Sequence, residues 1–464
     1  MLIISLDQNS KVPMYEQIYK FIKDEIKSGN IPVHTKLPSS RNLATHLQIS
    51  RSTVDLAYNQ LVSEGYIESV PKSGYYVLNI GDLIHISNNE TKPNVVKIPK
   101  STKMKYDFSP FAVDISSFPF ATWRKLSNQC MNDMNQGLFL LGENQGDIAL
   151  RKAISNYLHE SRGVNCDARR IIIGAGSDYL LQLLSQLLPR QSKICMENPT
   201  YKRAYHILNG MGFPIIPIGM KEEGVSLEQI EQSDGNIVYV TPSHQYPLGV
   251  VMPIKSRLEL IRWAANDSTR YIIEDDHDSE FRYIGKPIPS LQGIDTFDRV
   301  IYMGTFSRAI APAIRVGYMV LPEELYKKYQ QEYYYYASTV SRIDQAIICE
   351  FIVGGYFERH VNKMRKHYKN KHDLLLKTLK IFGNRIRITG ENAGLHLVVE
   401  FLEEVSEEDL IEKASQQGIQ LYGLNRHYIT EEKPKYPTIL LGYANVSEDD
   451  IKNGIQLLYE GLYE

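Results

Sequence analysis

Apolar side chains recur with helical spacing in three short stretches near the N-terminus. In the first stretch, Met14, Ile18, Ile22 and Ile26 lie four residues apart, which places them on one side of an amphipathic helix that a glycine ends. In the other two stretches a serine precedes the apolar positions, and serine caps helices well because its hydroxyl accepts a hydrogen bond from a free backbone amide. The pattern predicts helices between residues 13 and 29, from residue 39 or 40 to residue 47, and from residue 50 to residue 65.

Two β-type runs follow these helices. They cover residues 66–70 and 75–78, and the turn-forming residues 71–74 separate them, which predicts a β-hairpin. Three helices and a hairpin make a winged helix, which places its third helix in the DNA major groove and its hairpin near the backbone or minor groove. A small helical packing module is the alternative. Charge does not decide between them, because residues 1–78 hold eight Lys plus Arg and seven Asp plus Glu.

The remainder of the chain alternates strand and helix patterns. β-rich runs at residues 171–173, 237–240, 271–273 and 300–303 alternate with helical stretches such as residues 178–188 and 254–265. This alternation predicts an α/β domain with a mixed, mostly parallel sheet, and such folds bind ligands at the carboxyl ends of their strands. Residues 79–105 are polar and lack a sustained period, which is typical of a tether. We therefore expect a winged-helix domain at 1–78, a linker at 79–105 and a large domain at 106–464.

Composition narrows the class of protein. Of 464 residues, 43% are hydrophobic and 23% are charged, and 52 Lys plus Arg against 54 Asp plus Glu leave a net charge of −2. These values exclude a mostly disordered chain and a globally basic nucleic-acid coat. No apolar run reaches the roughly 20 residues that a membrane span needs, and the first ten residues lack the features of a signal peptide, so we expect a cytoplasmic protein that does not bind membranes. The four cysteines are scattered, and no metal site is indicated.

Chemistry-bearing residues follow several predicted strands. After residues 171–173 the chain reads GAGSDYLLQLL, a glycine turn before a helix whose free amides can hold a phosphate. MENPTYKRAYHIL offers Tyr201 for stacking on a flat ring, and YIIEDDHDSEFRY ends a strand with Asp275, which can pair with a protonated ring nitrogen. GTFSRAIAPAIRVGY supplies Thr305, Ser307 and Arg315 as phosphate ligands.

Long strings in the chain resemble two known families. LPSSRNLATHLQISRSTVDLAYNQLVSEGYIESVPKSGYYV, at residues 37–77, resembles the GntR-type winged helix-turn-helix of bacterial transcription regulators. The later motifs, together with TPSHQYPLG at residues 241–249, resemble the fold-type I aminotransferase domain of proteins that use pyridoxal 5'-phosphate (PLP). A chain that carries both resembles the MocR/GabR family of regulators over essentially its full length.

The resemblance implies three sets of binding residues and a homodimer. For operator DNA the candidates are Arg41, Arg51, Ser52, Thr53, Lys72 and Gly74. For PLP they are Ser177, Asp178, Tyr201, Asp275, His277, Thr305, Ser307, Arg308 and Arg315. For the carboxylate of a small amino-compound effector they are Arg203 and Arg426.

Two positions depart from the family pattern. The family segment reads GTFSK, and its lysine forms the Schiff base with PLP, whereas this chain has Arg308. A guanidinium stays protonated and is a poor nucleophile, so this position supplies no catalytic residue. His277 stands where the family usually has a tyrosine, and its N–H can serve the same cofactor oxygen. We therefore expect PLP to bind non-covalently or as a preformed aldimine with an amino acid.

These features favour a transcription regulator whose aminotransferase-like domain senses PLP, an amino compound or both, and controls operator binding. Two alternatives stay open. One is an active PLP-dependent aminotransferase with an appended DNA-binding domain, against which Arg308 argues. The other is a PLP-free regulator whose large domain serves only dimerisation.

Overall fold

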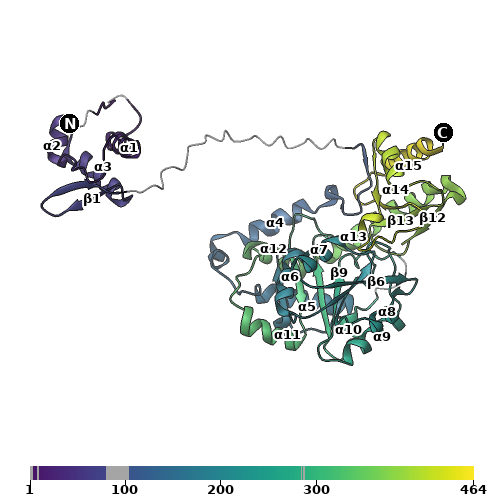
Figure 1. Ribbon diagram of the computed structural model, residues 1–464. Helices are drawn as coiled ribbons and strands as arrows, with labels where there is room; N and C mark the ends of the chain where they lie inside the picture. The colour runs from purple at the N-terminus through teal and green to yellow at the C-terminus, as the bar shows by residue number, and fades with distance from the viewer. Residues whose placement is uncertain (1–3, 8–9, 80–103, 284, 286–287, 464) are drawn as a thin grey trace. The chain divides into compact units, whose positions relative to one another are not determined.

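A computed structural model describes residues 4–7, 10–79, 104–283, 285 and 288–463 (Figure 1). The chain divides into two compact units, Met1–Ser101 and Thr102–Glu464. The tether predicted at residues 79–105 lies outside the described residues except at its two ends, and the predicted domain limits stay predictions. Among the described residues, every helix is too short or too polar to cross a lipid bilayer.

The N-terminal unit is a winged helix, as the sequence predicts. Its elements are α1 Met14–Lys27, α2 Ser40–Leu47, α3 Arg51–Ser63, β1 Ile67–Val70 and β2 Gly74–Val77.

Serine caps fix where its second and third helices begin. Ser39 accepts a hydrogen bond from the Asn42 amide and caps α2, and Ser50 accepts one from the Thr53 amide and caps α3. Gln48, in the left-handed conformation, ends α2 and turns the chain toward α3.

One apolar core holds this unit together. The isoleucine stripe of α1 packs against α2, α3 and the hairpin, and Ile18, Ile22 and Ile26 are buried. β1 and β2 pair antiparallel from Ile67 with Val77 to Val70 with Gly74. This hairpin, the wing of the winged helix, therefore begins one residue later and ends one residue earlier than the sequence predicts.

The large unit is built on an eight-stranded sheet. Its strands are β4 Ile171–Gly174, β5 Ile194–Asn198, β6 Ile215–Lys221, β7 Gly224–Val225, β8 Ile237–Val240, β9 Tyr271–Asp276, β10 Val300–Thr305 and β11 Gly317–Val320. They lie in the order β4-β11-β10-β9-β8-β5-β6-β7, and β7 and β11 run antiparallel to their neighbours. The predicted α/β architecture is confirmed.

Helices cover both faces of this sheet (Figure 1). They are α4 Phe120–Cys130, α5 Ile148–Arg162, α6 Gly176–Leu187, α7 Lys202–Gly210, α8 Leu227–Gln232, α9 Ile254–Ala265, α10 Leu291–Ile294, α11 Glu323–Lys328, α12 Arg342–Val353 and α13 Tyr356–Leu379. Along β4, Ile172 packs toward α6 while Ile171 and Ile173 pack toward α5 and α12. Burial on both faces explains why the strands are almost continuously apolar in sequence.

A smaller lobe follows in the chain. Its antiparallel sheet has the order β12 Ile386–Thr389, β13 His396–Phe401, β16 Thr438–Gly442 and β15 Tyr422–Gly423. The helices α13, α14 Glu407–Gln416 and α15 Glu448–Tyr463 lie beside this sheet (Figure 1). Their apolar residues form one core with it. A short parallel pair, β3 Tyr106–Asp107 with β14 Ile419–Gln420, joins the start of the unit to this lobe.

Candidate functional site

The strand ends that the sequence singles out meet at one cavity of the large unit. Its volume is about 470 Å³. Every residue predicted for PLP and for the effector lines this cavity: Ser177, Asp178, Tyr201, Arg203, Asp275, His277, Thr305, Ser307, Arg308, Arg315 and Arg426. They come from the ends of β4, β5, β9 and β10 and from the later lobe, as expected for a ligand site of a mostly parallel sheet.

The start of α6 forms one wall of the cavity and fits an anion. In the part of the chain that the structure describes, no side chain caps this helix at Ala175, so its first amides are free to face a ligand. Gly176 has a φ of +80°, and a Cβ built on it would lie 3.1 Å from Arg315 Nη2. Arg315 Nη2 in turn donates to Asp178 Oδ2 at 3.0 Å. The glycine therefore permits both the turn and the close approach of the guanidinium.

Hydroxyl groups from β10 and the following loop complete this wall. Thr305 Oγ1 lies 3.0 Å from Ser307 Oγ, and Ser307 Oγ donates to the Ile314 carbonyl at 2.9 Å. Both side chains are fixed by the loop and are only partly buried. Free amides, two hydroxyls and a guanidinium are the donor set that binds a phosphate.

Asp275 lies at the buried end of the cavity. Its Oδ2 accepts a hydrogen bond from Tyr239 at 2.5 Å, and burial raises the pKa of its carboxyl. A buried carboxyl of this kind is stabilised in its charged form by a cationic partner such as a protonated ring nitrogen. Tyr201, which is half-buried at the same cavity, meets Tyr246 edge-to-face with 5.8 Å between ring centroids. This arrangement fits a flat, protonated heterocycle.

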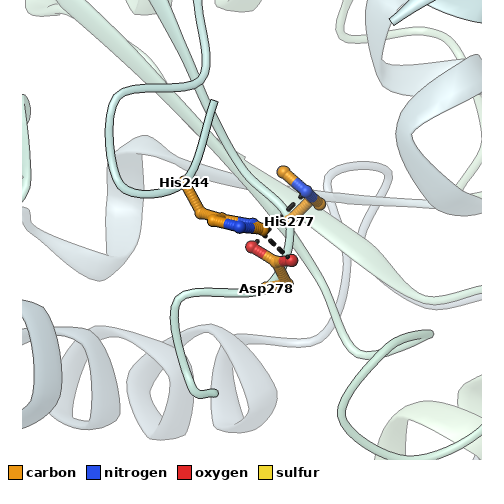
Figure 2. A group of neighbouring side chains, drawn as sticks. All are labelled: His244, His277 and Asp278. Atoms are coloured by element: carbon orange, nitrogen blue, oxygen red, sulfur yellow. Dashed lines mark hydrogen bonds and ion pairs between the residues drawn. The ribbon is translucent and has the colours of Figure 1, made fainter. Parts of the chain in front are cut away.

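His277 belongs to a cluster with His244 and Asp278 (Figure 2). His244 Nδ1 lies 3.0 Å from Asp278 Oδ2, and His277 Nε2 lies 3.4 Å from Asp278 Oδ1. Burial alone would raise the pKa of Asp278, but the two rings hold it well below its usual range. Burial lowers the pKa of His277, and the Asp278 carboxylate more than offsets this, so that the pKa is raised.

The cluster orients His277 and favours its protonated form. Its donor atoms lie within 4.8 Å of one another, a set that can also coordinate a divalent transition metal. The absence of a metal site therefore stays a prediction.

Arg308 has an unusual environment. Its side chain is half-buried at the cavity, and its Nη1 is buried without a hydrogen-bond partner among the described residues. An unpaired buried donor is costly, so a ligand acceptor at this position would stabilise the site.

The two candidate effector arginines differ in their surroundings. Arg203 is 58% exposed and its Nη1 lies 3.5 Å from Asp178 Oδ2. Arg426 stacks on Tyr422 at 5.0 Å, and its Nε donates to His427 Nε2 at 3.3 Å. Both positions allow contact with an anionic ligand.

Sequence reasoning missed several residues of the cavity wall. They are Phe111, Gly176, Lys202, Thr241, Tyr246, Pro312 and His427. Thr241 and Tyr246 stand in the TPSHQYPLG string and could have been inferred from it. Lys202 is a lining amine, and burial lowers its pKa; its Nζ donates to the Tyr428 carbonyl at 3.0 Å.

In the N-terminal unit the predicted DNA contacts lie at the start of α2, the start of α3 and the wing. Arg41, Arg51, Ser52 and Lys72 are exposed, and Thr53 and Gly74 are half-buried.

The first turn of α3 is held by its own polar groups. The hydroxyl of the capping residue Ser50 lies 2.8 Å from both the Ser52 and the Thr53 hydroxyls. Arg51 forms an exposed ion pair with Asp55, with 3.4 Å between Nε and Oδ2. Such a pair is weak, so the guanidinium is free to contact DNA.

Comparison with known proteins matches both units. Residues 14–77 match the family of bacterial regulatory proteins of the gntR type, and residues 110–458 match aminotransferase class I and II. The aminotransferase class I and II fold implies PLP binding in that family, and the donor groups that line the cavity fit this cofactor.

Individual relatives span nearly the whole chain. An uncharacterized HTH-type transcriptional regulator of Bacillus subtilis, YdeL, is 40% identical and covers 98% of this chain and 97% of its own length. The probable rhizopine catabolism regulatory protein MocR of Rhizobium meliloti is 31% identical, covering 98% and 95%. Among solved structures, kynurenine aminotransferase of Pyrococcus horikoshii has a TM-score of 0.69 at 25% identity, covering 78% of this chain and 91% of its own.

Proposed function

Because this chain belongs to the MocR/GabR-type transcription regulators, in which a GntR-type DNA-binding domain precedes an aminotransferase class I and II domain, we propose that its large unit binds PLP without a covalent bond and thereby controls DNA binding. The observation that carries this proposal is a cavity with phosphate and ring ligands in which an arginine follows Ser307, where the family pattern has lysine.

The residues that would hold PLP divide by the part of the cofactor they fit. The amides at the start of α6, with Ser177, Thr305, Ser307 and Arg315, suit the phosphate. Asp275 suits the ring nitrogen, Tyr201 the ring face, and His277 the phenolic oxygen. When bound, PLP supplies an electron-withdrawing ring and an aldehyde. The protein's own part is to bind and orient it and to hold a proton on His277.

The chemistry of Arg308 is the reason why the large unit would bind PLP without catalysing transamination. Transamination needs a base that moves a proton, and the lysine normally supplies it. A guanidinium does not release its proton in a protein, so Arg308 can bind an anion but cannot serve as that base. Lys202 is the rival amine at the cavity, but its Nζ is engaged by the Tyr428 carbonyl and lies 4.5 Å from the Tyr205 ring centroid.

A trapping experiment tests the binding mode. The full chain is saturated with PLP, reduced with borohydride, digested and analysed by mass spectrometry. We expect no pyridoxyl group on the wild-type chain and a stable adduct at position 308 in Arg308→Lys. A specific adduct on Lys202, or on any other lysine of the wild-type chain, would overturn the non-covalent mode, and multiple-turnover transamination would favour an active aminotransferase instead.

The DNA-binding surface is proposed from the exposed residues of the winged helix. Arg51, with Ser52 and Thr53, would contact base edges and phosphates from the first turn of α3. Arg41 would contact the DNA backbone from the start of α2. Lys72 and Gly74 would contact it from the hairpin. A homodimer would bind two operator half-sites, and Arg203 and Arg426 would bind the effector. Sedimentation of the full chain with and without operator DNA tests the dimer.

A further inference from the structure

The cavity carries more positive than negative charge. Five basic side chains line it, whereas the acidic side chains among its lining residues are Asp178 and Asp275. The basic residues are Lys202, Arg203, Arg308, Arg315 and Arg426. An excess of this size in a concave site favours ligands with several negative charges.

Existing contacts account for only some of these cations. Asp178 Oδ2 lies 3.0 Å from Arg315 Nη2 and 3.5 Å from Arg203 Nη1, so one carboxylate serves two guanidinium groups. Asp275 is paired with the Tyr239 hydroxyl. Among the described residues, Arg308 and Arg426 form no ion pair with a carboxylate.

The phosphate of PLP does not remove this excess. The groups proposed for the phosphate are the first amides of α6 with Ser177, Thr305, Ser307 and Arg315, and Arg315 already pairs with Asp178. Arg308 directly follows Ser307, and its buried Nη1 is an N–H donor without an acceptor among the described residues. A guanidinium pairs best with a carboxylate, which accepts two parallel hydrogen bonds.

We propose that Arg308 and Arg426 form a dicarboxylate subsite beside the PLP site, so that the effector is a small dicarboxylate, with or without an amino group. The inference rests on the proposed function of the large unit as the sensor. At position 308 the family pattern has a lysine whose amine forms a covalent bond, whereas this chain has a guanidinium that binds anions. The site would therefore recognise the two carboxylates of the ligand rather than its amino group. Arg426, stacked on Tyr422 and 5.8 Å from the Phe111 ring centroid, binds the second carboxylate.

Calorimetric titration of the PLP-loaded full chain tests the subsite. The probes are malonate, succinate, glutarate and adipate, with pentanoate as the monocarboxylate matched to glutarate. We expect one chain length to bind best and pentanoate to bind roughly 10- to 100-fold more weakly than that dicarboxylate, because it lacks one charge-assisted hydrogen-bonded pair. Equal binding of pentanoate and the dicarboxylates would overturn the proposal.

A variant of Arg308 tests its part in the subsite. Arg308→Met is expected to lower dicarboxylate affinity to that of pentanoate and to lower PLP affinity, measured by absorbance, by a smaller factor. If Arg308→Met weakens PLP as much as the dicarboxylate, the arginine serves the cofactor and the subsite is refuted.

The same proteins separate this inference from the sensor function. DNA affinity is measured with PLP alone and with PLP plus the best dicarboxylate. If DNA binding responds to PLP but no dicarboxylate binds, the subsite fails and the sensor stands. If a dicarboxylate binds through Arg308 and no ligand changes the DNA affinity, the proposed sensor function is wrong and the subsite is supported.

Discussion

Removing the charge of Arg308 is expected to stabilise the ligand-free protein. The substitution Arg308→Met keeps an unbranched apolar stem of similar length and removes a guanidinium whose Nη1 is buried without a partner among the described residues. An unsatisfied buried N–H costs about 1–3 kcal/mol. For a unit of the size of residues 102–464, the entropy of unfolding is about 0.8 kcal/mol/K. The variant should therefore melt about 1–4 °C higher than the wild type.

Differential scanning calorimetry without PLP or carboxylates measures this shift. Arg308→Lys is the control, because it keeps a positive charge at the cavity and should gain less. Addition of glutarate should reverse the order, since only the wild-type chain has the guanidinium that the ligand pairs with. A ligand-free Arg308→Met protein that melts at or below the wild-type temperature would refute the reasoning, because Arg308 would then be satisfied within the folded chain.

Three further predictions concern DNA contacts, the phosphate cradle and buried charge. Lys72→Ala should lower the slope of log affinity against log salt by about one, and Arg51→Ala should cost about 1–3 kcal/mol and relax sequence preference, both measured by fluorescence anisotropy. Gly176→Ala should lower PLP affinity roughly 5- to 30-fold, because a φ of +80° costs an L-residue about 1–2 kcal/mol and the added Cβ would crowd the Arg315 guanidinium. The control Gly212→Ala, at a φ of +91° with nothing within 4 Å of its added Cβ, should leave PLP affinity unchanged. Burial raises the pKa of Glu197 to about 7, so its contribution to stability is present below its ordinary pKa and is lost as pH rises through 7. Denaturant titrations from pH 4.5 to 7.5 should therefore show the wild type losing about 3 kcal/mol more than Glu197→Gln, and parallel curves would contradict this.

The sequence predicts the fold and the membership of the cavity because both depend on local patterns. Periodicity and serine caps locate the three helices of the winged helix, and the capping contacts of Ser39 and Ser50 are present. The rule that ligands lie at strand ends predicts that Tyr201, Asp275 and Thr305 meet, although more than one hundred residues separate the first from the last. Arg308 was predicted from the family resemblance, and it lines the same cavity.

Other features depend on contacts that no local pattern encodes. The hydrogen bond from Tyr239 to Asp275 arises because β8 and β9 are neighbours, and Tyr239 reads in sequence as one more apolar strand residue. The pairing of His244 with Asp278 joins two loops 34 positions apart. The position of Lys202 at the cavity and the lack of a partner for Arg308 Nη1 among the described residues likewise depend on the three-dimensional structure. These are the features on which the chemistry of the site depends.

We propose that the large unit senses PLP through a reversible, non-covalent site and that PLP binding changes the affinity of the winged helix for DNA. The most direct test is fluorescence anisotropy of the full chain on DNA from upstream of its own gene, at fixed salt, with and without PLP. Coupling between two sites is typically about 1–3 kcal/mol. Saturating PLP should change the dissociation constant for this DNA at least about 5-fold, and dialysis should restore the original value. A dissociation constant that PLP leaves unchanged, or a change that dialysis cannot reverse, would contradict this proposal.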